Sequence, residues 1–169
     1  MPTLKNELEA MVALKRQCGH LAKDLRFSGI EDLLLRHGRA FALGELPHGH
    51  RLPRELKGCF WNAYKASMPK RSHWIYVEGL ARHGDMPFAV HHAWLTRADQ
   101  SDVAFDPTWQ GRFDMAREYM GIAIRRDYVV GMFQRSKRKY LSVFDTYWAG
   151  FPIYTGQDRI EDVTWSAAA

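Results

Sequence analysis

A thiol, an imidazole and a carboxylate become available in this order along the chain, as Cys59, His92 and Asp106. A cysteine nucleophile needs a base that takes its proton and an acid that holds the base in the right tautomer. A lone residue of any of these types is more often structural, because free cysteines are commonly buried and inert. Taken together, with their order and neighbours, the three residues predict a Cys-His-Asp catalytic triad.

Two short strands would bring the base and the acid together. Residues 88–95 alternate so that His92 and Trp94 share one face and His91 lies on the other. Residues 103–106 form a second strand, which Pro107 stops because proline cannot donate a ladder hydrogen bond. Since the connection is short, we expect an antiparallel pair in which Asp106 lies beside His92.

The thiol is expected at the start of a helix. Residues 59–68 follow Gly58 and have one face of apolar or small side chains. In the first turn of a helix, backbone N–H groups without an acceptor and the positive end of the dipole favour a thiolate. The same N–H groups could stabilise an oxyanion in the transition state.

These features together resemble a known family. A Gly-Cys pair at a helix start, a strand with His-Ala-Trp and a strand that ends in Asp-Pro-Thr are similar to the transglutaminase-like superfamily of papain-like cysteine enzymes. The resemblance covers residues 58–109, about a third of the chain. It implies Cys59 as nucleophile, His92 as general base and Asp106 as orienting acid, with Gly58 and Trp94 in support. Residues 76–79, Tyr-Val-Glu-Gly, are also similar to small bacterial and phage proteins of this pattern.

The expected chemistry is formation of an acyl-enzyme at an amide or ester carbonyl. Hydrolysis of a protein or peptide amide, as by a cysteine peptidase or amidase, is favoured, and no cofactor is expected. Transfer to an amine, as by a transglutaminase- or acyltransferase-type effector, stays open. A different class is a catalytically inactive binding protein that uses a basic surface.

Charge and composition leave the partner open. The chain has 169 residues, enough for one domain with a real core, a formal net charge of +5 and a pI near 9.3. Much of the basic excess lies in Arg125, Arg126 and residues 135–139, which we interpret as a solvated helix end. Nucleic acid is possible but not favoured, since no DNA- or RNA-binding signature is present. No apolar run approaches a membrane span and no signal peptide is seen, so a cytoplasmic protein without membrane contact is expected.

The remaining cysteine and histidine patterns carry weaker signals. Cys18 lies on the apolar stripe of a helix expected over residues 4–25 and is predicted to be a core residue. A Cys18–Cys59 disulfide is the alternative that would exclude catalysis. His48 and His50 could bind a metal, but zinc sites need three or four ligands, so no metal is expected.

Glu78 has two interpretations. It lies with Trp74 and Tyr76 on one face of a strand expected over residues 71–80. An exposed strand carboxylate is favoured over a buried polar group that supports the site, because carboxylates are rarely buried unpaired.

The expected fold is α+β: an antiparallel sheet of three or more strands packed against the Cys-bearing helix, with N-terminal helices over the core. One domain, 1–169, would contain an N-terminal helical part (1–38), a catalytic core (58–124) and a C-terminal helix and coil (125–169). Between these features we expect a helix over 30–37, a loop over 40–57, a short helix over 115–120, a strand over 119–124, a helix over 127–139 and ordered coil from 140.

Overall fold

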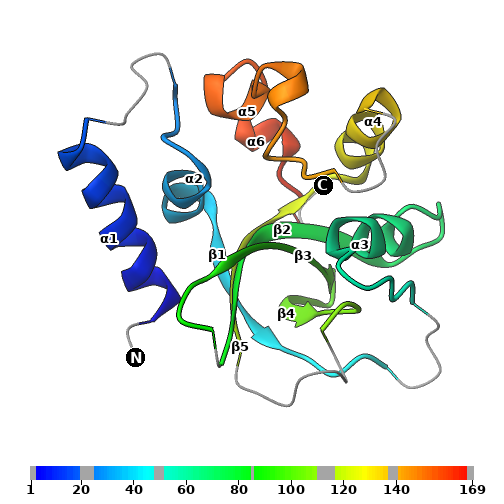
Figure 1. Ribbon diagram of the computed structural model, residues 1–169. Helices are drawn as coiled ribbons and strands as arrows, with labels where there is room; N and C mark the ends of the chain where they lie inside the picture. Colours follow the sequence, from blue (N-terminus) through cyan, green and yellow to red (C-terminus); the bar gives the residue numbers. More distant parts are fainter. Residues whose placement is uncertain are drawn as a thin grey trace.

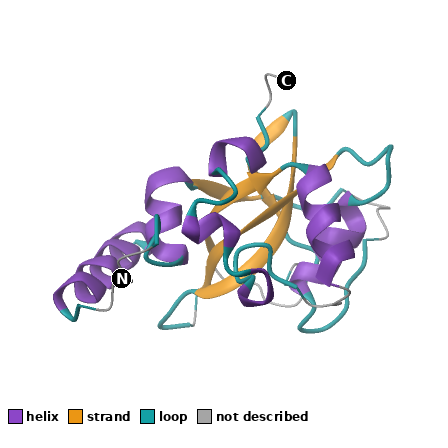
Figure 2. Cartoon of the chain, turned by 90° about the horizontal axis from the view of Figure 1, so that it is seen from above, coloured by secondary structure: helices purple, strands orange, loops and turns teal. Residues whose placement is uncertain are grey.

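The computed structural model describes residues 3–19, 25–47, 52–84, 86–109, 117–136 and 141–166. Within these ranges, the strands are β1 (Arg39–Leu43), β2 (Trp74–His83), β3 (Val90–Arg97), β4 (Gln100–Phe105) and β5 (Arg117–Ile124). The helices are α1 (Leu4–Gln17), α2 (Ile30–His37), α3 (Cys59–Ser67), α4 (Arg126–Ser136), a 3-10 turn η1 (Tyr147–Ala149), α5 (Pro152–Thr155) and α6 (Ile160–Val163). The strands form the centre of the molecule and the helices lie around them (Figures 1 and 2).

The strands close into a barrel in the order β1-β4-β3-β2-β5. β2 pairs antiparallel with β3 and β5, and β3 pairs antiparallel with β4. β1 closes the ring, because it pairs parallel with β4 and antiparallel with β5. The prediction of an open antiparallel sheet is therefore wrong.

The error arises from β1, which lies in a stretch predicted as loop. In the sequence Arg-Ala-Phe-Ala-Leu only Phe41 is buried, so no long alternating pattern marks the strand. Its pairing comes from two strands that lie far away in the sequence. β1 also lies upstream of the span 58–124 that was expected to hold the core.

Aromatic and small side chains fill the barrel. Trp94 is fully buried there and packs edge-on against Phe41 and Tyr119, with ring centroids 5.5 and 5.1 Å away. Gly121 on β5 makes room for the indole, since a Cβ at this position would lie 2.6 Å from a ring atom of Trp94. The glycine is therefore required by a close approach rather than by backbone conformation.

Gly121→Ala is expected to lower the free energy of unfolding by about 2–3 kcal/mol, because the added methyl group overpacks the barrel. Gly131→Ala on α4 is the matched control. A Cβ there meets no heavy atom within 4 Å, and alanine favours a helix by up to about 1 kcal/mol over glycine. Urea unfolding of both variants measures the difference. If Gly121→Ala and Gly131→Ala changed the free energy of unfolding equally, Trp94 would not be tightly packed against Gly121.

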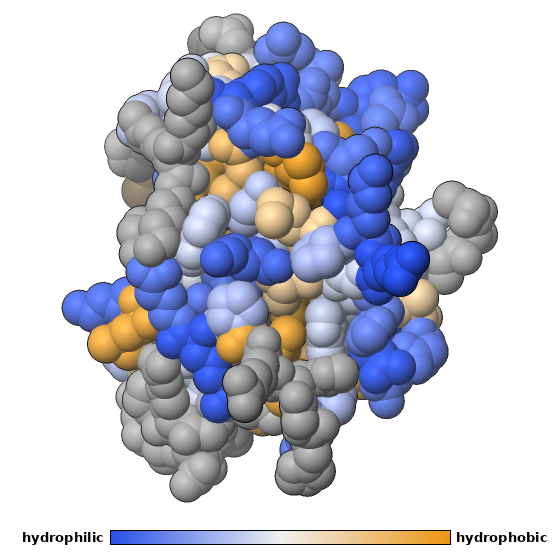
Figure 3. Space-filling model, turned by 90° about the vertical axis from the view of Figure 1, so that its right-hand side faces the viewer, coloured by the Kyte–Doolittle hydropathy of each residue, from blue (hydrophilic) through white to orange (hydrophobic). Residues whose placement is uncertain are grey.

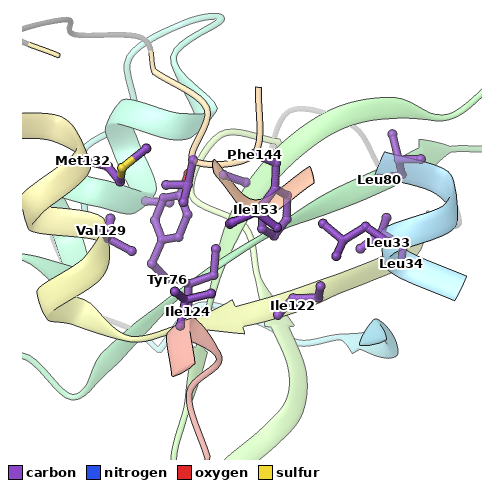
Figure 4. Close-up of a cluster of buried hydrophobic side chains, with 14 of the residues drawn as sticks. Leu33, Leu34, Tyr76, Leu80, Ile122, Ile124, Val129, Met132, Phe144 and Ile153 are labelled. Carbon is purple, nitrogen blue, oxygen red and sulfur yellow. The ribbon is translucent and has the colours of Figure 1, made fainter. Parts of the chain in front are cut away.

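A second hydrophobic cluster lies between the outer face of the barrel and the helices. Side chains of β2 and β5 meet those of α2, α4 and α5 there, among them Leu34, Tyr76, Ile122, Met132 and Ile153 (Figure 4). This cluster fixes the helical layer on the barrel, including the C-terminal part.

The N-terminal helix is shorter than predicted. α1 ends at Gln17, and its buried residues are Leu4, Leu8 and Val12. Cys18 caps the helix and is exposed, so its prediction as a core residue is wrong. Cys18 and Cys59 are both free thiols, which removes the disulfide alternative.

The remaining helices and strands agree with the sequence predictions only in part. α2 and α3 begin where they were expected. Residues 117–120 belong to strand β5 and not to a short helix, and the predicted C-terminal coil contains η1, α5 and α6. None of the helices in the described ranges combines the length and apolar character needed to cross a bilayer.

Candidate active site

α3 places the candidate nucleophile at its first residue. Gly58 is the N-cap and lacks a side chain that could cap the helix, and its carbonyl accepts the N–H of Asn62 at 2.8 Å. Cys59 is half-buried. α3 packs against β2 and β3, so the first turn faces the strand that carries His92.

The base and the acid are in direct contact. Nε2 of His92 lies 2.8 Å from Oδ2 of Asp106. Asp106 follows β4 directly, where the chain leaves the ladder at Pro107, and reaches across to β3. The side chains are 2% and 0% exposed, so water does not screen the pair.

The thiol completes the cluster. The thiol of Cys59 lies close enough to His92 to be among the groups that raise the pKa of the imidazole. Because Asp106 holds Nε2, Nδ1 is the ring nitrogen available to the thiol. The structure thus brings together the three residues on which the sequence analysis was centred.

The environment keeps His92 protonated. Burial lowers its pKa, but the charge of Asp106, the hydrogen bond to Asp106 and the contact with Cys59 outweigh burial and raise the pKa from 6.5 to about 10. Burial raises the pKa of Asp106, while His92 and hydrogen-bond donors hold it below its usual value. Near neutral pH, therefore, an imidazolium is paired with a carboxylate.

This pair is expected to make stability depend on pH. A pKa that is higher in the folded state gives stabilisation that is complete below the unfolded value of 6.5 and is lost as the pH rises through about 10. The free energy of unfolding should therefore fall between these pH values more steeply in the wild type than in His92→Gln. Urea unfolding at several pH values measures both slopes, and equal slopes would contradict the assigned protonation of His92.

Asp106 accepts more hydrogen bonds than the sequence suggested. Oδ1 accepts the backbone N–H groups of Thr108 and Trp109 at 2.8 and 3.0 Å, and Oδ2 also accepts the hydroxyl of Tyr119 at 2.9 Å. Trp109 stacks on His92 with ring centroids 4.0 Å apart. Tyr119 had no assigned role, because its strand lies beyond the motif and only the barrel brings it to Asp106.

Asn62 is a further residue that sequence reasoning missed. Its side-chain amide is fully buried. It accepts the N–H of Glu55 and donates to the carbonyl of Glu55, each at 2.8 Å, and it also donates to Oγ1 of Thr108 at 3.0 Å. It thus ties the Cys59 helix to the segment that enters it and to the turn after Asp106. Its place one helical turn after Cys59 was the available signal.

Asn62→Ala is expected to lower the free energy of unfolding by about 2–3 kcal/mol, since it leaves buried polar groups of Glu55 and Thr108 without partners. Ser67→Ala on the same helix is the control, because that hydroxyl makes a local bond to the carbonyl of Tyr64. In chemical unfolding, the free energy of unfolding of Asn62→Ala should be clearly lower than that of Ser67→Ala. The reverse order would show that water replaces the Asn62 amide without cost.

Trp94 and Glu78, which were predicted to support the site, are both fully buried. Trp94 lies inside the barrel, with its ring centroid 6.3 Å from that of His92, and does not reach the surface. Glu78 is fully buried, so the preferred interpretation as an exposed carboxylate is wrong. It is buried because several donors from β2, β3 and the C-terminal segment surround its carboxylate.

Metal ligands do not gather in the part of the chain that the structure describes. No group of three or more His, Cys, Asp or Glu residues there has an arrangement that could hold a metal ion. His48 and His50 lie outside the described residues.

Comparison with known proteins identifies no relative. The chain matches no protein-family model, no curated protein and no solved structure. The function must therefore be argued from the geometry.

Proposed function

We propose that the chain is a thiol enzyme that forms an acyl-enzyme at Cys59, most simply a cysteine peptidase or amidase acting on a protein or peptide. The observation that carries this proposal is the buried contact of His92 with Asp106 beside the thiol at the start of α3. Covalent catalysis of this kind needs a nucleophile beside its base and the base beside an orienting acid. Cys59, His92 and Asp106 would fill these three roles.

In the proposed reaction His92 takes the proton of the Cys59 thiol, which gives a thiolate beside an imidazolium. The thiolate attacks the substrate carbonyl and forms a C–S bond, while the carbonyl π electrons move to oxygen. When the tetrahedral intermediate collapses, the C–N bond breaks and His92 gives its proton to the leaving amine. His92 then takes a proton from water, whose oxygen displaces the thiolate and releases the acid.

The oxyanion is stabilised by backbone N–H groups. The first N–H groups of a helix have no intrahelical acceptor, and the positive end of the dipole of α3 adds to their effect. No side chain is required for this role.

The surface beside the thiol suits a peptide. Leu56 is 69% exposed just before Gly58, and Phe60 and Trp61 are half-buried after Cys59. Figure 3 views the side of the molecule on which α3 lies and shows hydrophobic surface in the middle of that face, bordered by hydrophilic residues. Such a surface can take apolar side chains of an extended substrate.

The resemblance to transglutaminase-like enzymes supports the same chemistry. A helix that begins with the cysteine, a strand with the histidine and an aspartate after the next strand occur here in the order of that superfamily. Transfer to an amine differs from hydrolysis only in the acceptor that attacks the acyl-enzyme, so it is the alternative within this proposal.

An activated ester tests the proposal. With p-nitrophenyl acetate, the wild type should release a burst of about one p-nitrophenol per chain, and mass spectrometry should find the acetyl group on Cys59. Cys59→Ala should abolish the burst, and the matched variant Cys18→Ala should retain it. Equal acetylation of the two cysteines would contradict the proposal. Adding methylamine to the acyl-enzyme then distinguishes transfer from hydrolysis.

A further inference from the structure

A second polar cluster lies on the other face of the strands that carry the site. Glu78 on β2 accepts the hydroxyl of Tyr76 at 2.6 Å, Nε2 of His91 at 2.9 Å and the hydroxyl of Ser142. The backbone N–H groups of Val143 and Phe144 donate to it at 2.8 and 3.1 Å. These donors stabilise a carboxylate that is completely buried, and they keep its pKa below the usual value although burial opposes this.

The cluster lies close to the thiol. His91 is the neighbour of His92 on β3, and its ring contacts Phe60, the residue after Cys59, with centroids 5.1 Å apart. The charge of Cys59 is among the causes that raise the pKa of Tyr76, whose hydroxyl is bonded to Glu78. A thiolate at Cys59 therefore lies within electrostatic range of a buried negative charge.

Only one of the five donors can neutralise that charge. Ser142, Tyr76 and the two backbone groups donate as neutral dipoles, whereas His91 forms an ion pair with Glu78 when it is protonated. Like charges disfavour each other more strongly where water screens them poorly, and Glu78 is fully buried. Without a cation at His91, the Glu78 carboxylate would oppose the thiolate that the proposed reaction needs.

We propose that His91 is a positioning residue for the thiol, whose positive charge offsets the buried Glu78 carboxylate and thereby maintains the reactive thiolate of Cys59. This inference rests on the proposed function, because it concerns the ionisation of the same nucleophile. It also gives a role to the second histidine of the His91-His92 pair, which points away from the Cys59–His92 contact.

Three tyrosines among the described residues also interact with the charge of Glu78. Tyr76 on β2, Tyr128 on α4 and Tyr154 on α5 all have a pKa raised by burial first and by the charge of Glu78 among the further causes. They therefore stay neutral near neutral pH. Among the described residues that donate to Glu78, His91 is the side chain that can carry a positive charge.

The test is the pH dependence of Cys59 alkylation by iodoacetamide in five proteins: wild type, His91→Gln, His91→Arg, Ser142→Ala and His92→Gln. His91→Gln keeps a donor for Glu78 but removes the cation, so the midpoint should move up by about one pH unit. His91→Arg restores a cation, and its partly exposed position accepts the longer side chain, so its midpoint should stay near that of the wild type. Ser142→Ala removes a neutral donor from the same carboxylate oxygen and should leave the midpoint unchanged.

Two outcomes would overturn the inference: an unchanged midpoint in His91→Gln, or equal shifts in His91→Gln and His91→Arg, which would indicate a structural effect. Thermal unfolding of each variant confirms that it is folded. A different result would contradict the proposed function: an unchanged pH profile of Cys59 alkylation in His92→Gln. If His92→Gln changes the profile and His91→Gln does not, the inference is wrong while the proposed function stands.

Discussion

Asp106→Asn is expected to slow acylation of Cys59 by about 10³–10⁴-fold. The carboxylate accepts a hydrogen bond from Nε2 of His92, and this fixes the tautomer in which Nδ1 faces the thiol. An amide that donates to Nε2 would place the ring proton on Nδ1, which could then no longer accept the proton of Cys59. The substitution also removes the charge that stabilises the imidazolium.

The burst rate with p-nitrophenyl acetate measures this effect, and Tyr119→Phe is its matched control. That variant removes one neutral hydrogen bond to the same oxygen of Asp106 but leaves the contact with His92. A loss of about 1 kcal/mol corresponds to roughly a fivefold slower reaction. Comparable losses in Asp106→Asn and Tyr119→Phe would mean that Asp106 contributes through packing and not through the tautomer.

Glu78→Ala is expected to produce the largest loss of stability, about 3–5 kcal/mol. It would leave His91, Ser142 and two backbone N–H groups of the C-terminal segment without their acceptor in a buried site. Because this carboxylate binds residues 142–144 to the barrel, the C-terminal segment should loosen first.

Urea unfolding with Ser142→Ala as control measures the effect. Ser142→Ala removes one donor to the carboxylate, together with the oxygen that accepts the N–H groups of Phe144 and Asp145, and should cost about 1–2 kcal/mol. Hydrogen exchange of the Val143 and Phe144 amides should become much faster in Glu78→Ala than in Ser142→Ala. A mild effect of Glu78→Ala, similar to that of the control, would show that another acceptor replaces the carboxylate.

The parts of the site that were predictable depend on short-range patterns. A helix beginning at Cys59, a strand carrying His92 and a turn at Asp106 each follow from a few neighbouring residues, and a short connection brings the two strands together. Alternation along the strand also predicted that His91 and His92 point to opposite faces, as their separate partners Glu78 and Asp106 show.

The closed barrel was not predictable in the same way. β1 has one buried residue, Phe41, and owes its conformation to β4 and β5, which lie about 60 and 80 residues further along the chain. Tyr119 reaches Asp106 only because β5 closes this ring. Its role therefore had no local signal.

Buried polar residues were the second source of error. Glu78 was interpreted as exposed because a buried carboxylate needs partners, and three of its five donors lie more than 60 residues away in the C-terminal segment. Cys18 was predicted as core from its place on an apolar stripe, but α1 ends before it, and a helix end leaves its cap accessible. Tertiary contacts thus decided the burial of Glu78, and the end of the helix decided the exposure of Cys18.

The proposed catalytic pair of Cys59 and His92 is tested most directly by the pH dependence of cysteine alkylation, followed for each residue by mass spectrometry. Cys18 is exposed and serves as the internal comparison in the same molecule. At pH 6 an ordinary thiol is almost wholly protonated, so Cys59 should react about tenfold faster or more than Cys18, and this difference should vanish in His92→Ala. If the two cysteines instead react in parallel as the pH rises, in the wild type as in the variant, Cys59 has no activating base and the proposed enzyme does not exist.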